Sequence, residues 1–173
     1  LVDHAQPGAE IRVWVPGCST GKEAYTLGML LAEQVEKSGK KVNLQIFGTD
    51  SNVASLTAAR SGIYSREEIG ENLSPERRKR FFVRKDGLYQ VSKAIREQVV
   101  FAPQNLTADP PFFRLDLISC RNVLIYLDQQ AQNKIVSLFH FALREGGFLF
   151  LGNAETVGDR EDLFVPVSKK WRI

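Results

Sequence analysis

Hydrophobic residues along the chain fall into short apolar runs that alternate with stretches of helical periodicity. The short runs are predicted strands and cover residues 11–15, 42–48, 98–102, 115–120 and 148–151. The longer stretches, in which apolar residues recur every three or four positions, are predicted helices over residues 22–37, 51–60 and 128–143. Strands separated by helices are typical of a doubly wound parallel sheet, so we predict an α/β fold.

Residues with capping preferences mark the ends of the second and third predicted helices. Ser51 or Asp50 precedes the second helix, and Asp128 begins the third, because short polar side chains bond the free amides of a first helical turn. The pair Gly146-Gly147 is expected to end the third helix.

Residues 73–98 break the alternation and are predicted to form a small β-rich insertion. Ser74-Pro75 is a helix start, and the turn 85-KDG-87 lies between two β-prone runs, which is a hairpin signal. At the other end of the chain, residues 163–173 are expected to return as an antiparallel hairpin.

The composition is that of one ordinary globular domain. The chain has 173 residues, of which 43% are hydrophobic and 25% charged, and its net charge of +3 does not by itself indicate a nucleic-acid partner. Cys18 and Cys120 lie far apart without metal-ligand spacing, and no apolar run is long enough for a membrane span. We therefore expect a reduced, cytoplasmic protein that does not insert into membranes. Since the chain opens on Leu1 rather than Met, we expect a piece of a longer protein.

The segment 16-PGCSTGKE-23 joins the first predicted strand to the first helix and is a candidate cofactor loop. In a doubly wound sheet this turn lies at the ligand crevice, where glycines let backbone amides approach a ligand. The glycine spacing fits neither G-x-G-x-x-G nor a phosphate-binding loop. A tight structural turn explains the loop equally well, so the loop alone does not distinguish a cofactor site from a simple turn.

Polar residues follow two other predicted strands, at the edge of the sheet where the crevice is expected. Asp50 lies 29 positions after Gly21, and its carboxylate suits the two hydroxyls of a ribose. The alternative is that Asp50 only caps the next helix. Arg121 and Asn122 follow the strand at 115–120 and need polar partners that a ligand can supply. Nearby, Tyr126 either contributes to the site or packs under the following helix.

Six stretches, in order, resemble the catalytic domain of the CheR-type chemotaxis methyltransferases. They are 12-RVWVPGCSTGKEAYTL-27, 46-IFGTD-50, 59-ARSGIY-64, 99-VVFAPQNL-106, 115-LDLISCRNVLIYLD-128 and 147-GFLFLGNAET-156. The wording of the first and fifth is most similar to the methyltransferase part of fusions with a methylesterase-like domain. The resemblance covers residues 1–173 and implies a class I, Rossmann-like methyltransferase fold with a seven-stranded sheet, the 73–98 insertion, and S-adenosylmethionine (SAM) as cofactor, with S-adenosylhomocysteine as product.

The resemblance also implies roles for individual residues. The cofactor-binding set is Gly17, Ser19, Thr20, Gly21, Glu23, Asp50, Asn105, Leu106, Arg121 and Asn122. Within it, Asp50 binds the ribose, Asn105 and Leu106 flank the adenine, and Arg121 lies near the amino-acid end. Arg121 and Tyr126 are the expected catalytic residues.

The implied activity is transfer of a methyl group from SAM to glutamate side chains on the cytoplasmic helices of chemoreceptors. A glutamate is ionised near pH 7, so the reaction requires alignment rather than a strong general base, and no metal is expected. Two departures from the family are visible: Lys22 replaces a usual acidic residue, and the N-terminal helical domain of the family is absent from the sequence. The compact insertion also differs from longer forms that bind a receptor peptide.

The basic cluster at residues 77–85 has three interpretations. It is a basic face for acidic receptor helices, an RNA-binding patch with Phe81 and Phe82 as stacking platforms, or an ordinary helix face followed by a strand. We favour the receptor for the charges and local structure for the phenylalanines, and expect no nucleic-acid partner. The alternative to an enzyme is a SAM-binding sensor or scaffold module without turnover.

Overall fold

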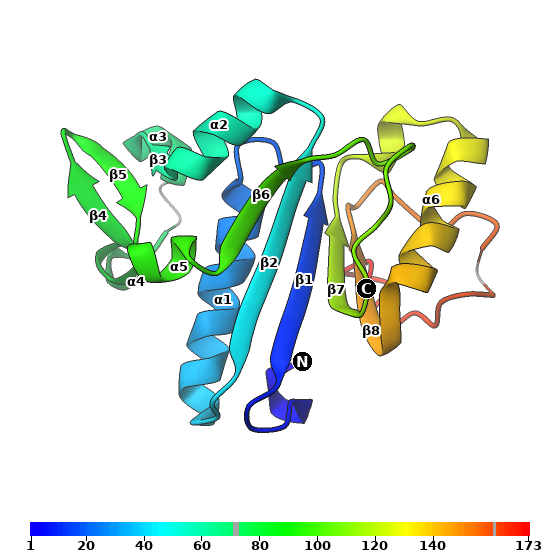
Figure 1. Cartoon of the computed structure of the whole chain (residues 1–173), viewed down its shortest axis with the longest axis horizontal. Helices are drawn as coiled ribbons and strands as arrows, with labels where there is room; N and C mark the ends of the chain where they lie inside the picture. Colours follow the sequence, from blue (N-terminus) through cyan, green and yellow to red (C-terminus); the bar gives the residue numbers. More distant parts are fainter. Residues whose placement is uncertain (71–72, 161) are drawn as a thin grey trace.

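A computed structural model describes residues 1–70, 73–160 and 162–173, and a five-stranded parallel sheet forms its centre (Figure 1). The strands, in their order across the sheet, are β6 (Val99–Pro103), β2 (Asn43–Asp50), β1 (Glu10–Pro16), β7 (Leu115–Cys120) and β8 (Leu143–Leu151). The predicted α/β class with a parallel sheet is confirmed. Against the seven strands that the resemblance implies, the described residues place five in this sheet and three in a separate antiparallel sheet.

The strand order reverses at β1, which lies between β2 and β7. Trp14 of β1 pairs with Phe47 on one side and Ile118 on the other, both in parallel register. The chain runs outward from β1 through β2 to β6, and then returns past β1 to β7 and β8. Such a switch point opens a crevice at the carboxyl ends of the strands, which is where the predicted site residues fall.

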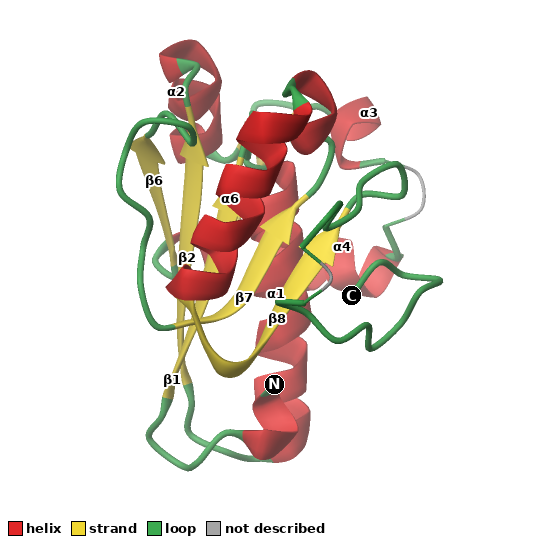
Figure 2. Ribbon diagram, turned by 90° about the vertical axis from the view of Figure 1, so that its right-hand side faces the viewer, coloured by secondary structure: helices red, strands yellow, loops and turns green. Residues whose placement is uncertain are grey.

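Helices cover both faces of the sheet because neighbouring residues of β1 point to opposite sides. Val13 and Val15 pack in the core cluster that includes residues of α1 (Lys22–Ser38), whereas Trp14 packs in the cluster under α6 (Gln129–Ala142). Figure 2 shows these two helices on opposite faces of the sheet. Both helices were expected, and Asp128 caps α6 by accepting a hydrogen bond from the Ala131 amide.

Two predicted helix ends are wrong. The cap of α2 (Val53–Ser61) is Asn52, which accepts a hydrogen bond from Ser55, because the Asp50 carboxylate is engaged elsewhere. Gly146 and Gly147 do not end α6 but lie inside β8, which begins directly after the helix. They fall in a bulge where the pairing of β7 with β8 shifts register, and a Cβ on Gly147 would come within 3.0 Å of the Leu115 carbonyl oxygen.

The expected hairpin at residues 163–173 is not formed, because the segment contains no strand and consists of bends, turns and irregular backbone. Pro166 has no amide to donate to a strand ladder. The segment still folds back on β8, because the Leu151 amide donates to the Arg172 carbonyl at 3.0 Å.

The hairpin predicted around 85-KDG-87 is confirmed as part of a three-stranded antiparallel sheet. β4 (Phe82–Lys85) pairs with β5 (Leu88–Val91), which also pairs with β3 (Ile63–Tyr64). Asp86 and Gly87 both have positive φ, as a turn of this type requires. Three short helices accompany the sheet: α3 (Arg66–Ile69), α4 (Pro75–Phe81), which Ser74 caps as expected, and α5 (Lys93–Arg96).

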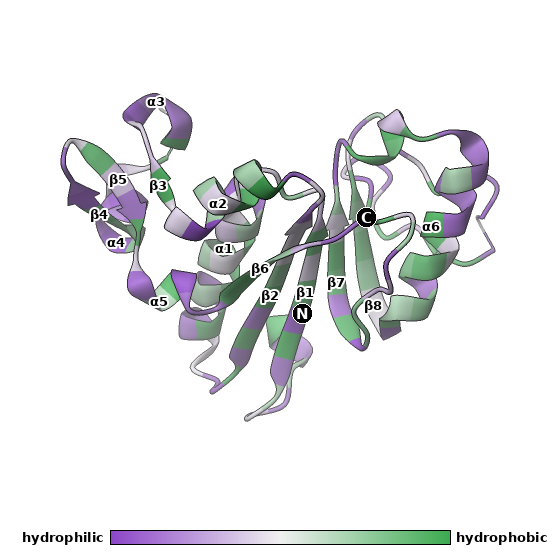
Figure 3. Ribbon diagram, turned by 45° about the horizontal axis from the view of Figure 1, so that its top comes forward, coloured by the Kyte–Doolittle hydropathy of each residue, from purple (hydrophilic) through white to green (hydrophobic). Residues whose placement is uncertain are grey.

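Part of the basic cluster at 77–85 holds this small sheet to the main body. Arg77 of α4 donates two hydrogen bonds, at 2.8 and 2.7 Å, to the carboxylate of Glu33 in α1, and Arg80 pairs with Glu36. Phe81 is buried in the core, so it is not available as a stacking platform. Figure 3 shows the strongly hydrophilic β4 at the end of the molecule opposite α6. Two of the charges assigned to a receptor therefore have partners within the chain.

Replacing Arg77 by Met should lower the free energy of unfolding at pH 7 more than replacing Lys79, a neighbouring exposed residue, by Met. The hydrogen bonds from Arg77 lower the pKa of the buried Glu33 below its ordinary value of 4.5. Stability from a lowered carboxyl pKa is present above the unfolded-state pKa and is lost as the pH falls through the folded-state pKa. Urea unfolding should therefore show a gap between wild type and Arg77→Met that closes below pH 4.5. A gap that persists unchanged in acid would contradict this origin.

Candidate functional site

The candidate loop between β1 and α1 is a compact turn anchored on the end of β2. The Cys18 amide donates to the Thr49 carbonyl at 2.9 Å, and the Gly21 amide returns to the Cys18 carbonyl at 2.8 Å. Gly17, Ser19 and Gly21 all have positive φ, a conformation that is unusual for Ser19. The turn thus places the exposed Ser19 and half-buried Thr20 at the carboxyl end of the sheet.

Close packing explains why residues 17 and 21 of the loop are glycines. A Cβ on Gly21 would lie 2.7 Å from the Phe101 ring and 2.9 Å from the Ala59 Cβ, and one on Gly17 would overlap Val123. The glycines therefore let the loop lie close against α2, β6 and the segment after β7. Packing alone explains the two glycines, so they do not indicate a ligand. The evidence for a ligand site comes from the polar groups around them.

Asp50 connects the loop to the end of β2. One carboxylate oxygen accepts a hydrogen bond from the Ser19 amide at 2.8 Å, and the other accepts one from the Asn52 amide at 2.8 Å. Asp50 therefore joins the loop to the segment before α2, and Asn52 rather than Asp50 caps that helix. Since each carboxylate oxygen can accept about two hydrogen bonds, both retain capacity for a ligand hydroxyl.

Glu23, in the first turn of α1, faces the end of β7. Its Oε1 accepts a hydrogen bond from the hydroxyl of buried Ser119 at 2.6 Å. Burial raises the pKa of the Glu23 carboxyl above its ordinary value, while the Ser119 hydrogen bond and the positive charge of Arg121 act in the opposite direction. The site thus holds a desolvated acid whose pKa stays raised although Ser119 and Arg121 favour its charged form.

The buried residue Glu155, which follows β8, was not among the predicted site residues. It is 3% exposed, and its carboxylate accepts four backbone hydrogen bonds, from the amides of Asn122, Val123, Leu124 and Gly152, at 2.7 to 2.9 Å. Its sequence signal was an acidic residue in a small, polar stretch directly after an apolar strand, in 147-GFLFLGNAET-156.

The Glu155 contacts shape the turn that carries Arg121 and Asn122. Asn122 is exposed and has a φ of +59°, and the Arg121 guanidinium lies 5.0 Å from the centre of the Phe150 ring. The Arg121 Nε is buried without a hydrogen-bond partner in the described part of the chain. A buried donor of this kind is a polar group that a ligand can satisfy.

Tyr126 ends the short 3-10 helix η2 (Leu124–Tyr126) and is 81% exposed. The alternative that it packs under α6 is therefore wrong. Its hydroxyl and ring are accessible to a second molecule at the same end of the sheet.

Asn105 and Leu106 follow β6, where the Gln104 amide donates to the Asp50 carbonyl at 3.1 Å. The Asn105 side chain closes a local turn by accepting hydrogen bonds from the amide and hydroxyl of Thr107. Leu106 is half-buried and lines a hollow of about 440 Å³ against α6. The residue before the pair is thus bonded to the backbone of Asp50, whereas the Asn105 side chain is satisfied locally.

The structure therefore brings together the loop, Asp50 and the residues after β7, at the carboxyl ends of β1, β2 and β7. Within residues 1–70, 73–160 and 162–173, no group of three or more potential metal ligands occurs. In the same residues, no helix is long and apolar enough to cross a membrane.

Comparison with known proteins identifies relatives along the whole chain. A family model described as the CheR methyltransferase SAM-binding domain matches residues 1–173. A 104.1 kDa uncharacterized protein of Rhodobacter capsulatus is 42% identical over all of this chain, which corresponds to 18% of that protein. Chemotaxis protein methyltransferases of Escherichia coli and Pseudomonas aeruginosa are 38% and 37% identical over 95% and 91% of this chain. The chain spans 59% of the length of each.

Solved structures share the fold at low identity. The glycopeptide N-methyltransferase MtfA with SAM has a TM-score of 0.51 at 12% identity, over 82% of this chain and 46% of MtfA. The DhpI complex with S-adenosylhomocysteine also has a TM-score of 0.51 at 12% identity, over 82% of this chain and 48% of DhpI. These likenesses bear out the class I methyltransferase fold.

Replacing Glu155 by Gln should destabilise the protein by roughly 3 kcal/mol, because an amide group would face backbone donors that now bond a carboxylate. The matched control is Glu145→Gln, an exposed position in β8 that should change stability by less than about 0.5 kcal/mol. Urea unfolding at pH 7 measures both. Equal stability of the two variants would show that the Glu155 contacts contribute little.

Proposed function

The chain belongs to the CheR methyltransferase family, and from that premise we propose that it carries out the methylation of glutamate side chains on chemoreceptors. The observation that carries the proposal is the convergence of Asp50, Glu23 and Arg121 at the switch point of a SAM-binding domain. The named chemotaxis methyltransferases among the relatives support the receptor as substrate.

The residues of the crevice fit SAM by their charge and hydrogen-bond capacity. The spare lone pairs of Asp50 suit the ribose hydroxyls, and its existing bonds to Ser19 and Asn52 hold the carboxylate in place. Glu23 uses only one oxygen on Ser119 among the described contacts, so we infer that the other accepts from the cofactor's ammonium group. Arg121, whose Nε is unpartnered among the described residues, suits the cofactor's carboxylate.

Asn105 and Leu106 would flank the adenine, with the half-buried Leu106 as the apolar surface. The loop from Gly17 to Gly21 would lie against the amino-acid end, and Asn122 beside Arg121. Ser19 and Asn122 both have positive φ and are exposed after their strands.

The cofactor supplies an electrophilic methyl group on a sulfonium. The acceptor glutamate is already ionised near pH 7, so the chain has no strong base to provide. Its contribution is to align the carboxylate oxygen with the methyl carbon and to exclude water. Because Tyr126 is exposed, we assign it a positioning contact with the incoming substrate.

The partners we infer are the cytoplasmic helices of chemoreceptors and a methylesterase-like domain that reverses the modification. The first follows from the names of the relatives, and the second from the resemblance of the loop and β7 sequences to fused chemotaxis proteins.

Calorimetric titration with S-adenosylhomocysteine tests the cofactor site. Asp50→Asn should weaken binding about 10- to 100-fold, since one carboxylate acceptor becomes a donor. The matched control is Asp86→Asn in the β4–β5 turn, where Asn is equally suited to positive φ and affinity should not change. Equal affinity of the two variants would place the cofactor elsewhere.

Transfer of labelled methyl from SAM to a receptor cytoplasmic fragment tests the reaction. Alkali should release the label, because a carboxylate methyl ester is hydrolysed under conditions that leave methyl amines intact. Tyr126→Phe should lower turnover while leaving S-adenosylhomocysteine binding and stability unchanged, since the side chain is exposed. Unaltered turnover would remove the hydroxyl from the mechanism. Binding without any transfer by the wild-type chain would favour a sensor or scaffold module.

A further inference from the structure

Helix α6 covers only part of its face of the central sheet, and the part of that face over β2 and β6 has no covering helix. The connection from β6 to β7, residues 104–114, is irregular, whereas most parallel strands are joined through a helix that covers the sheet. α1 lies behind β2 and β6, and no labelled helix lies in front of them (Figure 1). On this open face Val100 is 49% exposed, and Phe47 is covered by the ring of Phe112, whose centre is 4.3 Å away.

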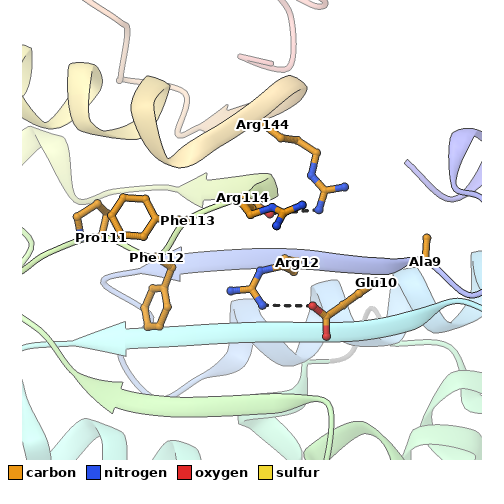
Figure 4. A pocket seen from close by; sticks show the side chains of 8 residues that line it. All are labelled: Ala9, Glu10, Arg12, Pro111, Phe112, Phe113, Arg114 and Arg144. Carbon is orange, nitrogen blue, oxygen red and sulfur yellow. Dashed lines mark hydrogen bonds and ion pairs between the residues drawn. The ribbon is translucent and has the colours of Figure 1, made fainter.

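A cavity of about 720 Å³ lies at the amino-terminal end of this face (Figure 4). Its lining residues come from the start of β1, the segment before β7 and the start of β8: Ala9, Glu10, Arg12, Pro111, Phe112, Phe113, Arg114 and Arg144. Because the strands are parallel, their amino ends lie at the edge opposite the candidate cofactor site. A molecule held here would leave the crevice free.

Positive charge in the cavity is only partly neutralised. Arg12 pairs with Glu10 at 3.2 Å, and Arg144 pairs with the buried Asp116 at 3.0 Å. Arg114 is exposed, and no ion pair forms on it from any residue that the structure describes. Arg144 also donates to the Arg114 carbonyl at 3.2 Å, which keeps the two arginines adjacent. Arg114 therefore leaves an unneutralised charge beside Arg144.

Exposed aromatic rings extend the cavity towards α6. Phe113 is 48% exposed and Phe141, at the end of α6, is 73% exposed. The two rings meet edge to face with their centres 5.6 Å apart. Exposed phenylalanines beside arginines are typical of the core of protein interfaces, where both residue types are enriched.

We propose that Arg12, Arg114, Arg144, Phe112, Phe113 and Phe141, together called the arginine–phenylalanine surface, dock an acidic amphipathic helix of a partner protein. Carboxylates of that helix pair with Arg114 and Arg144, and its apolar side chains cover Phe113 and Phe141. The helix occupies the part of this face that α6 and the irregular β6–β7 connection leave open.

Charge and shape select this occupant over others. Glu10 and Asp116 interrupt the arginines, which disfavours a continuous polyphosphate such as nucleic acid. Pairing two copies of a chain of net charge +3 through this surface would bring like charges together. The proposal is independent of the methyltransferase function, because it concerns the opposite edge of the sheet.

The test uses a fluorescent synthetic helix of about 18 residues, with leucines along one side and glutamates flanking them, and fluorescence anisotropy as the readout. The comparison probe has lysine at every glutamate position. We expect the glutamate helix to bind and the lysine helix not to bind. Arg114→Glu and Phe113→Ser should each weaken binding at least tenfold, and affinity should fall with added salt. Both side chains are substantially exposed, and a thermal melt verifies folding.

Arg84→Glu in β4 is the matched control, because it makes the same charge change at an exposed position on the small sheet and should leave the affinity unaltered. Equal loss of binding in Arg84→Glu and Arg114→Glu would overturn the proposal, as would equal binding of the two helices. Titration with inorganic pyrophosphate and with duplex DNA completes the test. Binding of either at this surface, without binding of the glutamate helix, would also overturn it.

Discussion

A single buried carboxylate joins the two strand ends on which half of the candidate site depends. Glu155 lies after β8, yet three of its four hydrogen bonds come from the turn after β7. Burying a charge is costly unless polar partners replace its water, and four backbone donors do so here. The fourth donor is Gly152, where a Cβ would lie 2.5 Å from a Glu155 oxygen. The backbone after β7 and the backbone after β8 are therefore both held in their positions by this one side chain.

The other half of the site is organised by a second carboxylate. Asp50 holds the loop after β1 through the Ser19 amide and the start of α2 through the Asn52 amide. The bond from Ser119 to Glu23 then connects α1 to β7, across the switch point. Three acidic side chains thus fix the relative positions of the strand ends before any ligand is bound. Preorganisation of this kind lowers the entropy lost when a cofactor binds.

The parallel sheet separates the chemistry of the chain into two edges. Acidic groups and Arg121 gather at the carboxyl ends of the strands, where we propose that the cofactor binds. At the amino ends, the arginine–phenylalanine surface forms because residues 104–114 cross without a helix. A third region, the small antiparallel sheet, is held to α1 by Arg77 and Glu33. Each region is therefore positioned by contacts between residues far apart in the sequence.

The sequence by itself determined the order of the five central strands and of α1, α2 and α6, the hairpin at 85-KDG-87, and the placement of Asp50, Arg121 and Asn122 at strand ends. These features depend on periodicity and turn chemistry over a few residues, which the sequence displays directly. It did not predict β3, α3 or α5. Only the tertiary structure decided which groups pair. Glu155 bonds an amide 33 positions away, and Asp50 bonds one 31 positions away, so that Asn52 is left to cap α2. The partner of a polar group depends on which distant residues the folded chain brings beside it. The local sequence pattern does not contain that information.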